Sequence, residues 1–176
     1  MKVITNLSNY LEEYSIYYLS RYSVSEKKFE YILLNKIKKD LLKGKINKLQ
    51  QNQCKEIIKN IICKFTNKKI INEEYLIESR ISSLVKKGMS FKKIKFILKK
   101  DKFKDSLITT NLNILKSDSN INNKLIDNYC SKKRLGKYSS SWNSVSEELH
   151  NRTMAKLLRQ GFDYKLCQSF LKWKHD

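Results

Sequence analysis

Apolar residues recur every three or four positions along most of this chain, which is the spacing of one buried face of an α-helix. The pattern is strongest in residues 26–43 and 49–67, where lysines occupy much of the remaining surface. The chain has no proline and only four glycines, so the residues that most often interrupt helices are nearly absent. These features predict an all-α protein. The apolar positions of the two segments are Phe29, Ile32, Leu33, Ile37 and Leu41, and Cys54, Ile57, Ile58, Ile61, Ile62 and Phe65.

Shorter patterns of the same kind predict further helices, to a total of about nine. Residues 136–142 are expected to form a loop and a hinge. In the helix expected at residues 73–87, the inward positions are predicted to be Tyr75, Leu76, Ser79, Ser83 and Leu84. The expected helices span residues 9–21, 26–43, 49–67, 73–87, 91–100, 104–115, 121–135 and 146–160, with a last helix after Asp163.

The stretch from residue 85 to 98 combines the end of one helix with the start of the next. Gly88 suits the position just past a helix end, where the backbone takes a positive φ. Ser90 has a side chain that accepts hydrogen bonds from the exposed N–H groups of a helix start. Lys86 and Lys87 complement the negative end of the preceding helix dipole. Similar caps are expected from Ser25, Asn72, and Ser144 or Ser146.

Two other stretches resemble this one, and they begin at Arg21 and Arg159. In all three, a basic residue lies four positions before a capping residue, and a lysine lies two positions after it. The capping residues are Ser25, Ser90 and Asp163, which are 65 and 73 residues apart, so each repeat would hold about three helices. Such repeats bury their apolar faces against their neighbours and form an elongated, curved array. The predicted repeats are residues 1–70, 71–117 and 118–176, in one continuous repeat domain.

The charge of the chain is strongly unbalanced, with 37 Lys and Arg against 17 Asp and Glu, a formal net charge of +20. Solubility requires a net charge of only about 2–8 for a small domain. A coding bias towards lysine, asparagine and isoleucine is one explanation, but it does not account for the shortage of acidic residues. We therefore favour a polyanionic partner, such as nucleic acid or an acidic protein surface.

The four cysteines do not form a metal-binding pattern, because there is no C-x-x-C and the two histidines are far apart. They lie on or beside expected core faces, so we interpret them as small, reduced, buried residues, as suits a cytoplasmic protein. No apolar run approaches the roughly 20 residues needed to cross a bilayer, and no signal peptide is expected. The cysteines are Cys54, Cys63, Cys130 and Cys167.

Three segments carry a likeness to one protein family. They read Y-Y-L-S-R-Y-S-V-S-E-K-K-F from residue 17, N-E-E-Y-L-I-E-S-R-I-S-S-L-V-K-K-G-M-S-F-K-K-I-K-F-I-L from residue 72, and L-G-K-Y…M-A-K-L-L-R-Q-G-F-D-Y from residue 135. Through these segments the chain resembles the RecX regulators of the RecA recombinase over nearly its whole length. Two departures are the many lysines in place of the family's arginines, and Asp101–Lys102 where the family usually has lysine–glycine at a helix end.

The resemblance implies an all-helical protein of three-helix repeats that lies in the groove of the RecA–single-stranded DNA filament. Such proteins inhibit strand exchange, ATP turnover and coprotease stimulation, and so regulate DNA repair, recombination and the SOS response. We expect a cytoplasmic monomer that has no catalytic residue, metal or cofactor, and that contacts RecA and single- or double-stranded DNA but no membrane. The candidate filament-binding residues are Arg21, Arg80, Lys86, Lys87, Lys92, Lys93, Lys132, Lys133, Arg134, Arg159 and Lys165.

Two other classes of function are weighed against this one. A basic helical repeat would also bind nucleic acid without sequence preference and without a protein partner. An enzyme is disfavoured, because the sequence has no phosphate-binding loop, no nucleophile–base pair, no metal-ligand spacing and no convergent carboxylates.

Several single residues allow two interpretations. Each candidate lysine also fits a solvated helix surface, and Arg80 also fits a salt bridge to Glu73 or Glu78. Trp142 is either an interface contact or packed on the helix at residues 146–160. Three tyrosines either stack on nucleic-acid bases or pack between helices, and their helical spacing favours packing. They are Tyr10, Tyr17 and Tyr18.

Overall fold

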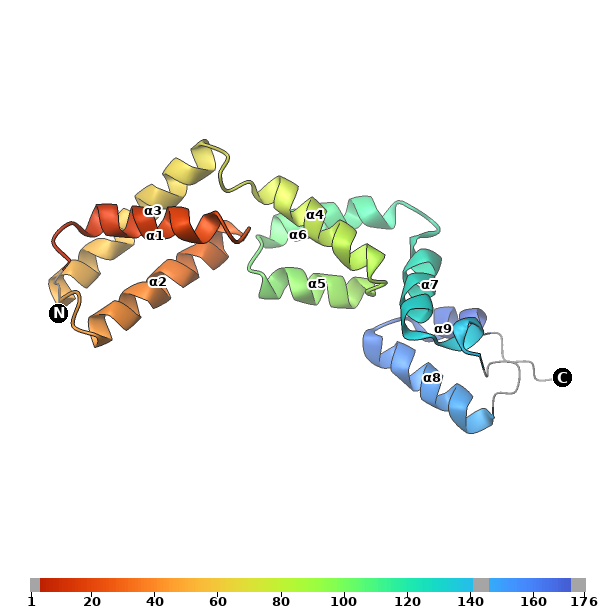
Figure 1. The fold of residues 1–176 in the computed structure, drawn as a ribbon. Helices are drawn as coiled ribbons and strands as arrows, with labels where there is room; N and C mark the ends of the chain where they lie inside the picture. Colours follow the sequence, from red (N-terminus) through yellow and green to blue (C-terminus); the bar gives the residue numbers. More distant parts are fainter. Residues whose placement is uncertain (1–3, 141–145, 172–176) are drawn as a thin grey trace. The chain divides into compact units, whose positions relative to one another are not determined.

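The structure, a computed structural model, describes residues 4–140 and 146–171, and within these residues every regular element is helical. This confirms the predicted all-α class with about nine helices (Figure 1). One 3₁₀ helix, η1, covers Gly136–Tyr138, in the segment predicted to be a loop. The α-helices are α1 Leu7–Leu19, α2 Glu26–Leu42, α3 Lys48–Asn67, α4 Glu73–Lys86, α5 Phe91–Lys100, α6 Asp105–Lys116, α7 Ile121–Lys133, α8 Glu147–Gln160 and α9 Tyr164–Leu171.

The predicted helix ends are confirmed to within two residues, because local chemistry sets them. Each of the capping side chains Ser25, Asn72, Ser90 and Ser146 accepts a hydrogen bond from the backbone N–H three residues later, at 3.0–3.3 Å. These bonds satisfy N–H groups that have no partner inside the helix. Trp142 and the last residues of the expected hinge lie outside the described residues.

The chain divides into two compact units. Unit 1 comprises Met1–Leu76 with Asp101–Phe103, and unit 2 comprises Ile77–Lys100 with Lys104–Asp176. Unit 1 contains the three helices expected in the first repeat, whereas most of the helices expected in the second and third repeats lie together in unit 2. The division into three repeats stays a prediction.

The three similar stretches do not occupy equivalent places in the helix order. Ser25 and Ser90 precede α2 and α5, so three helices separate the first two capping residues. Asp163 precedes α9, which lies four helices after α5. The third stretch therefore begins one helix too late for a strict three-helix period. The cause is that a basic residue near a helix end followed by a capping residue is a general helix-to-helix connection and recurs wherever two helices meet at a short turn.

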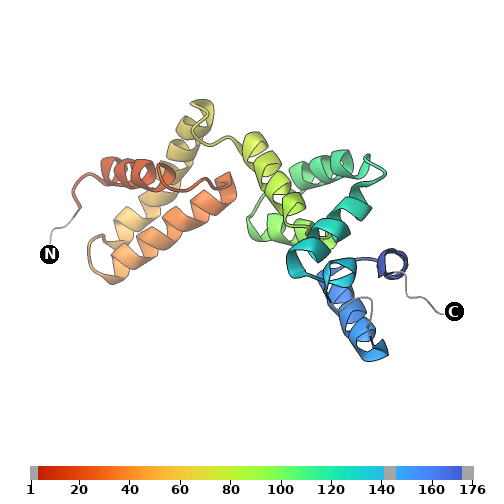
Figure 2. The ribbon, with the colours of Figure 1, turned by 45° about the vertical axis from the view of Figure 1, so that its right-hand side comes forward.

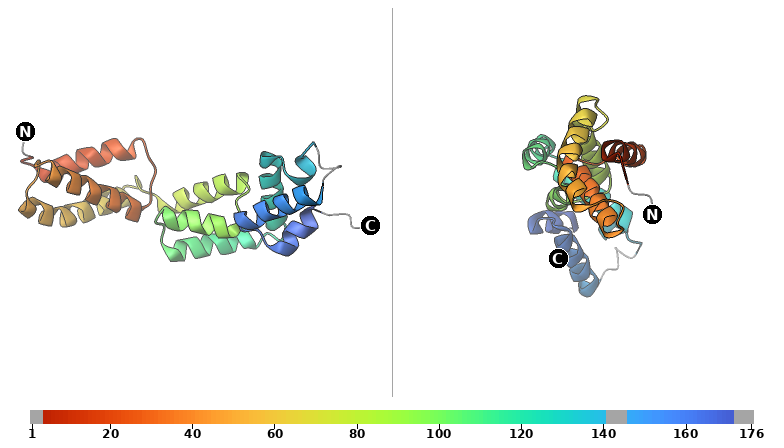
Figure 3. Two further views of the ribbon diagram at one scale, coloured as in Figure 1. Left: turned by 90° about the horizontal axis from the view of Figure 1, so that it is seen from below. Right: turned by 90° about the vertical axis from the view of Figure 1, so that its left-hand side faces the viewer.

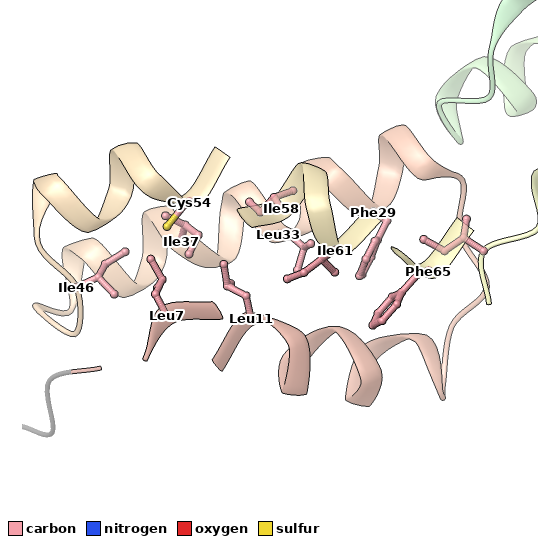
Figure 4. Close-up of a cluster of buried hydrophobic side chains, with 11 residues drawn as sticks. Leu7, Leu11, Phe29, Leu33, Ile37, Ile46, Cys54, Ile58, Ile61 and Phe65 are labelled. Atoms are coloured by element: carbon pink, nitrogen blue, oxygen red, sulfur yellow. The ribbon is translucent and has the colours of Figure 1, made fainter. Parts of the chain in front are cut away.

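Unit 1 is built on the side-by-side packing of α1, α2 and α3, which Figures 1, 2 and 3 show from different directions. Its buried apolar side chains come from all three helices (Figure 4). The predicted faces of α2 and α3 are confirmed, with residues such as Phe29, Leu33 and Ile58 at most 1% exposed. The cluster consists of Leu7, Leu11, Phe29, Leu33, Ile37, Ile46, Cys54, Ile58, Ile61, Phe65 and Ile71.

The predicted inner face of α4 is correct at Leu84 and wrong at Tyr75 and Ser79. Tyr75 is 70% exposed and Ser79 is exposed, while Ile77 and Ile81 are buried together with Leu84. The sequence of α4 carries two overlapping apolar stripes, and both have helical spacing. Which stripe turns inward depends on the neighbouring helices, and the periodicity of one helix does not contain that information.

A polar cluster lies in the interior of unit 1, around Asp40. Asp40 is 2% exposed and accepts hydrogen bonds of 2.7 Å from the Tyr10 hydroxyl and from the Lys36 ammonium. Burial lowers the pKa of Lys36, but the hydrogen bonds to Asp40 and Tyr10 outweigh it, so the pKa is raised overall. The lysine stays charged, and the buried carboxylate is compensated.

We expect Tyr10→Phe to lower the free energy of unfolding by about 1–2 kcal/mol, because Asp40 loses one of its two donors while remaining buried. Urea denaturation measures the change. Tyr14→Phe is the matched control, since Tyr14 is a half-buried tyrosine of the same helix and its hydroxyl forms no hydrogen bond. Equal stability of the two variants would show that the Tyr10 hydroxyl contributes nothing specific.

Candidate functional site

The site is centred on the turn between α4 and α5, where Gly88 ends α4. The Gly88 N–H donates to the carbonyl of Val85 at 2.9 Å, and the Met89 N–H donates to the carbonyl of Leu84 at 3.0 Å. These two bonds form a Schellman motif, with Gly88 at a φ of +70°. The predicted role of Gly88 is confirmed.

The backbone of α7 lies directly against Gly88. A Cβ atom at this position would come within 2.6 Å of the Tyr129 Cα and 2.7 Å of the Leu125 carbonyl oxygen. The Asn128 side chain also donates a 3.1 Å hydrogen bond to the Val85 carbonyl, which thus accepts from α7 as well as from Gly88. Only glycine therefore fits at this crossing, for steric as well as conformational reasons.

Ser90 connects the start of α5 to the end of α8. Its hydroxyl oxygen accepts from the Lys93 N–H at 3.2 Å, as predicted, and its hydroxyl donates to the Gln160 carbonyl at 2.6 Å. The Gln160 side chain in turn lies 2.9 Å from the Met89 sulfur. Gly161, at a φ of +93°, ends α8.

The same contact brings a candidate lysine to the end of α8. A Cβ added to Gly161 would lie 2.9 Å from the Ser90 hydroxyl oxygen and 3.2 Å from the Lys92 Cβ. The ring of Phe162, the next residue, is 5.9 Å from that of Tyr129 on α7. We call the meeting of residues 86–93, Tyr129 and residues 160–162 the central junction. Its long-range contacts through Asn128 and Gln160 have no signal in the sequence, because a polar side chain on a helix gives no indication of a distant partner.

Ten of the eleven candidate cations belong to unit 2, and nine of these ten are exposed. Four of them belong to the central junction, at the end of α4 and the start of α5, and Arg159 lies in the last turn of α8 beside it. The Arg159 charge acts on the Tyr129 hydroxyl, which places it near the Gly88 crossing. The nine are Lys86, Lys87, Lys92, Lys93, Lys132, Lys133, Arg134, Arg159 and Lys165.

None of these nine cations forms a salt bridge with a carboxylate in the described part of the chain. Elsewhere in unit 2 lysines do find acids, as Lys99 does with Asp105 and Lys137 with Asp127. The unpaired charges therefore add to a positive field around the junction, and such a field attracts polyanions.

Helix dipoles explain some of these positions and not others. Lys86 and Lys132 lie in the last turns of α4 and α7, where a cation is stabilising. Lys92 and Lys93 lie in the first turn of α5, where a cation opposes the dipole at about 0.3–1 kcal/mol each. The Lys93 ammonium lies 5.3 Å from the centroid of the Phe96 ring, which offsets part of this cost, whereas a bound anion would account for both lysines.

The remaining two candidates are not among the residues of the junction. Arg21 belongs to unit 1, where its guanidinium stacks on the ring of Tyr17. Arg80 is half-buried in α4 and already has an interaction partner within the protein, which makes it the weakest candidate contact residue of the eleven.

Two basic residues have backbone roles at helix ends. Arg134 takes the positive φ of +51° that ends α7. Lys102 takes the same conformation after α5, at a φ of +61°.

The cysteines are free thiols, and three of them are buried as predicted. Burial raises the pKa of Cys130 to about 12 and that of Cys167 to about 11, so both stay protonated at neutral pH. Cys63 is exposed on α3, contrary to the prediction, because it lies just outside the buried stripe of that helix.

No group of three metal-binding side chains occurs among the residues described here. No helix among them is both long enough and apolar enough to cross a membrane. Comparisons of the chain with protein-family models, curated proteins and solved structures found no match.

We expect Gly88→Ala to lower the free energy of unfolding by roughly 2–5 kcal/mol, since it adds left-handed backbone strain and a clash with α7. Gly44→Ala is the control, because Gly44 has a similar φ of +64° but lies exposed at the end of α2. Chemical denaturation of both variants separates strain from steric contact. Equal losses would mean that the approach of α7 to Gly88 has no energetic weight.

Proposed function

We propose that this protein is a non-enzymatic regulator that binds the RecA–single-stranded DNA filament and restrains recombination and ATP turnover. The identity of the partner rests on the sequence resemblance to the RecX family. The observation that best supports a polyanionic partner is the unpaired lysine pair, Lys92 and Lys93, in the first turn of α5. Two ammonium groups and the N–H groups of a helix start create a positive potential that the helix dipole opposes.

The physical basis of such binding is counterion release and repetition. Each phosphate neutralised by a lysine releases condensed ions, which makes the affinity large and strongly dependent on salt. A filament repeats the same acidic surface along its length, so contacts to more than one subunit raise the affinity without any new type of contact. We expect the exposed cations around the central junction to supply these contacts.

A second candidate is a nucleic-acid-binding protein that does not act through RecA. The same unpaired cations support it, because a positive field does not distinguish a filament from free DNA. The two proposals differ in whether the protein changes RecA turnover at concentrations that leave free DNA unbound.

We expect the protein to slow the single-stranded-DNA-dependent ATPase of RecA at or below stoichiometric amounts. The same concentration should leave most of an equal length of free single-stranded DNA unbound at the same salt, as measured by fluorescence anisotropy. Steep salt-dependent DNA binding together with unchanged RecA turnover would replace the first proposal with the second.

The variant Lys92→Glu/Lys93→Glu should change stability and binding in opposite directions. The free energy of unfolding should rise by about 0.5–1 kcal/mol, because acidic residues suit the first turn of a helix. Filament binding at 0.1 M salt should weaken by about tenfold or more, since one or two phosphate contacts are lost. Urea denaturation and inhibition of the RecA ATPase measure the two effects.

The matched control is Lys95→Glu/Lys100→Glu, which makes the same charge change at exposed positions of the same helix. We expect it to weaken filament binding by no more than about threefold and not to raise stability, because Lys100 lies in the last turn of α5. If both double variants weakened binding equally, the net charge would matter and the central junction would not.

A further inference from the structure

A second surface with its own chemistry lies in unit 1, where α1 ends. The Arg21 guanidinium carbon lies 4.1 Å from the centroid of the Tyr17 ring, and one of its N–H groups donates to the Tyr17 hydroxyl at 2.6 Å. Both residues are exposed, and Arg21 forms no salt bridge with any described carboxylate. The guanidinium group is thus held over the ring by contacts with an uncharged side chain, and no described carboxylate compensates its positive charge.

The next pair along the helix repeats this arrangement with two aromatic rings. The centroids of Tyr18 and Tyr22 are 4.9 Å apart, with 37° between the ring planes. Tyr22 remains 56% exposed. Tyr18 is half-buried and lies 6.1 Å from the ring of Phe29, a core residue of α2. The outer ring therefore rests on a support that is anchored in the hydrophobic core.

The backbone holds these two pairs in place past the end of the helix. The N–H groups of Arg21 and Tyr22 both donate to the Tyr18 carbonyl, at 3.1 and 3.0 Å. Arg21 and Tyr22 are thereby fixed next to each other, each four residues after its supporting tyrosine. Other tyrosines of α1 are used inside the protein, as Tyr10 is through its bond to Asp40. Packing between helices, which the sequence favoured for Tyr17, does not account for Tyr17 or Tyr22.

We propose that these pairs, Tyr17 with Arg21 and Tyr18 with Tyr22, form a stacking platform that binds the bases of single-stranded nucleic acid. Planar aromatic and guanidinium faces are the groups on which unpaired bases stack, in a way that tolerates any sequence. The uncompensated Arg21 charge and the net charge of +20 complement the phosphates beside those bases. A duplex keeps its base faces covered, so the platform selects single strands. This site goes beyond the proposed function and does not require RecA.

The side chains of the platform are already held in place in the free protein, which favours a high affinity for bases. A side chain that is already held in its bound orientation loses little conformational freedom when a ligand arrives. Arg21 and Tyr22 are each supported by a ring and by a backbone bond before any base is present. The stacking energy of each base is then available for binding.

The test compares two fluorescent ligands of equal length, oligothymidylate and a phosphodeoxyribose strand without bases, bound to the full chain by anisotropy without RecA. We expect Arg21→Lys and Tyr22→Leu each to weaken oligothymidylate binding by about fivefold to tenfold or more. Binding of the base-free strand should change less than twofold, because neither substitution changes the net charge of the protein.

The matched control is Tyr75→Leu, which removes a tyrosine of unit 1 that is 70% exposed and has no cation over its ring. It should leave both affinities unchanged, and circular dichroism should show the same helical content in all variants. Equal affinity of the wild-type protein for the two ligands, or an equal loss on both in Arg21→Lys, would overturn the platform and leave a surface for polyanions only. Neither result would bear on the proposed regulation of RecA, which the ATPase measurement tests separately.

Discussion

The contact between the α7 backbone and Gly88 is the constraint on which the central junction depends. No side chain fits between the two, and the turn around Gly88 lies between the end of α4 at Lys86 and the start of α5 at Phe91. Ser90 then caps α5 and reaches the last carbonyl of α8 with the same hydroxyl. A single tight turn thus connects parts of unit 2 that lie about 70 residues apart in the sequence.

The cations around this junction show a conflict between local stability and surface chemistry. Natural helices favour acidic residues in the first turn, as α8 has in Glu147 and Glu148. In α5 two lysines occupy that position and no carboxylate of the described chain compensates them. Local rules tend to be broken where function requires it, so this departure supports the proposal of a polyanionic partner.

The two units offer different chemistry to such a partner. Unit 2 presents ammonium groups around a turn, which interact with a phosphate backbone through charge and are sensitive to salt. Unit 1 presents Arg21 and Tyr22 on supporting rings, which interact with base faces and depend much less on salt. The buried cluster of Tyr10, Lys36 and Asp40 has no such role, because its charges already compensate each other inside the core.

The sequence alone determined the helix ends and the all-α class, because a cap such as Ser90 or a stop such as Gly88 acts through bonds within five residues. It also identified the basic residues of the junction, although not which of them gather there. Tertiary structure decided the inner face of α4, the exposure of Cys63, and the separation of Arg21 from the other candidates. It also placed Ser90 on Gln160 and α7 on Gly88. These outcomes depend on which helices become neighbours. Contacts between residues far apart in the chain determine that arrangement.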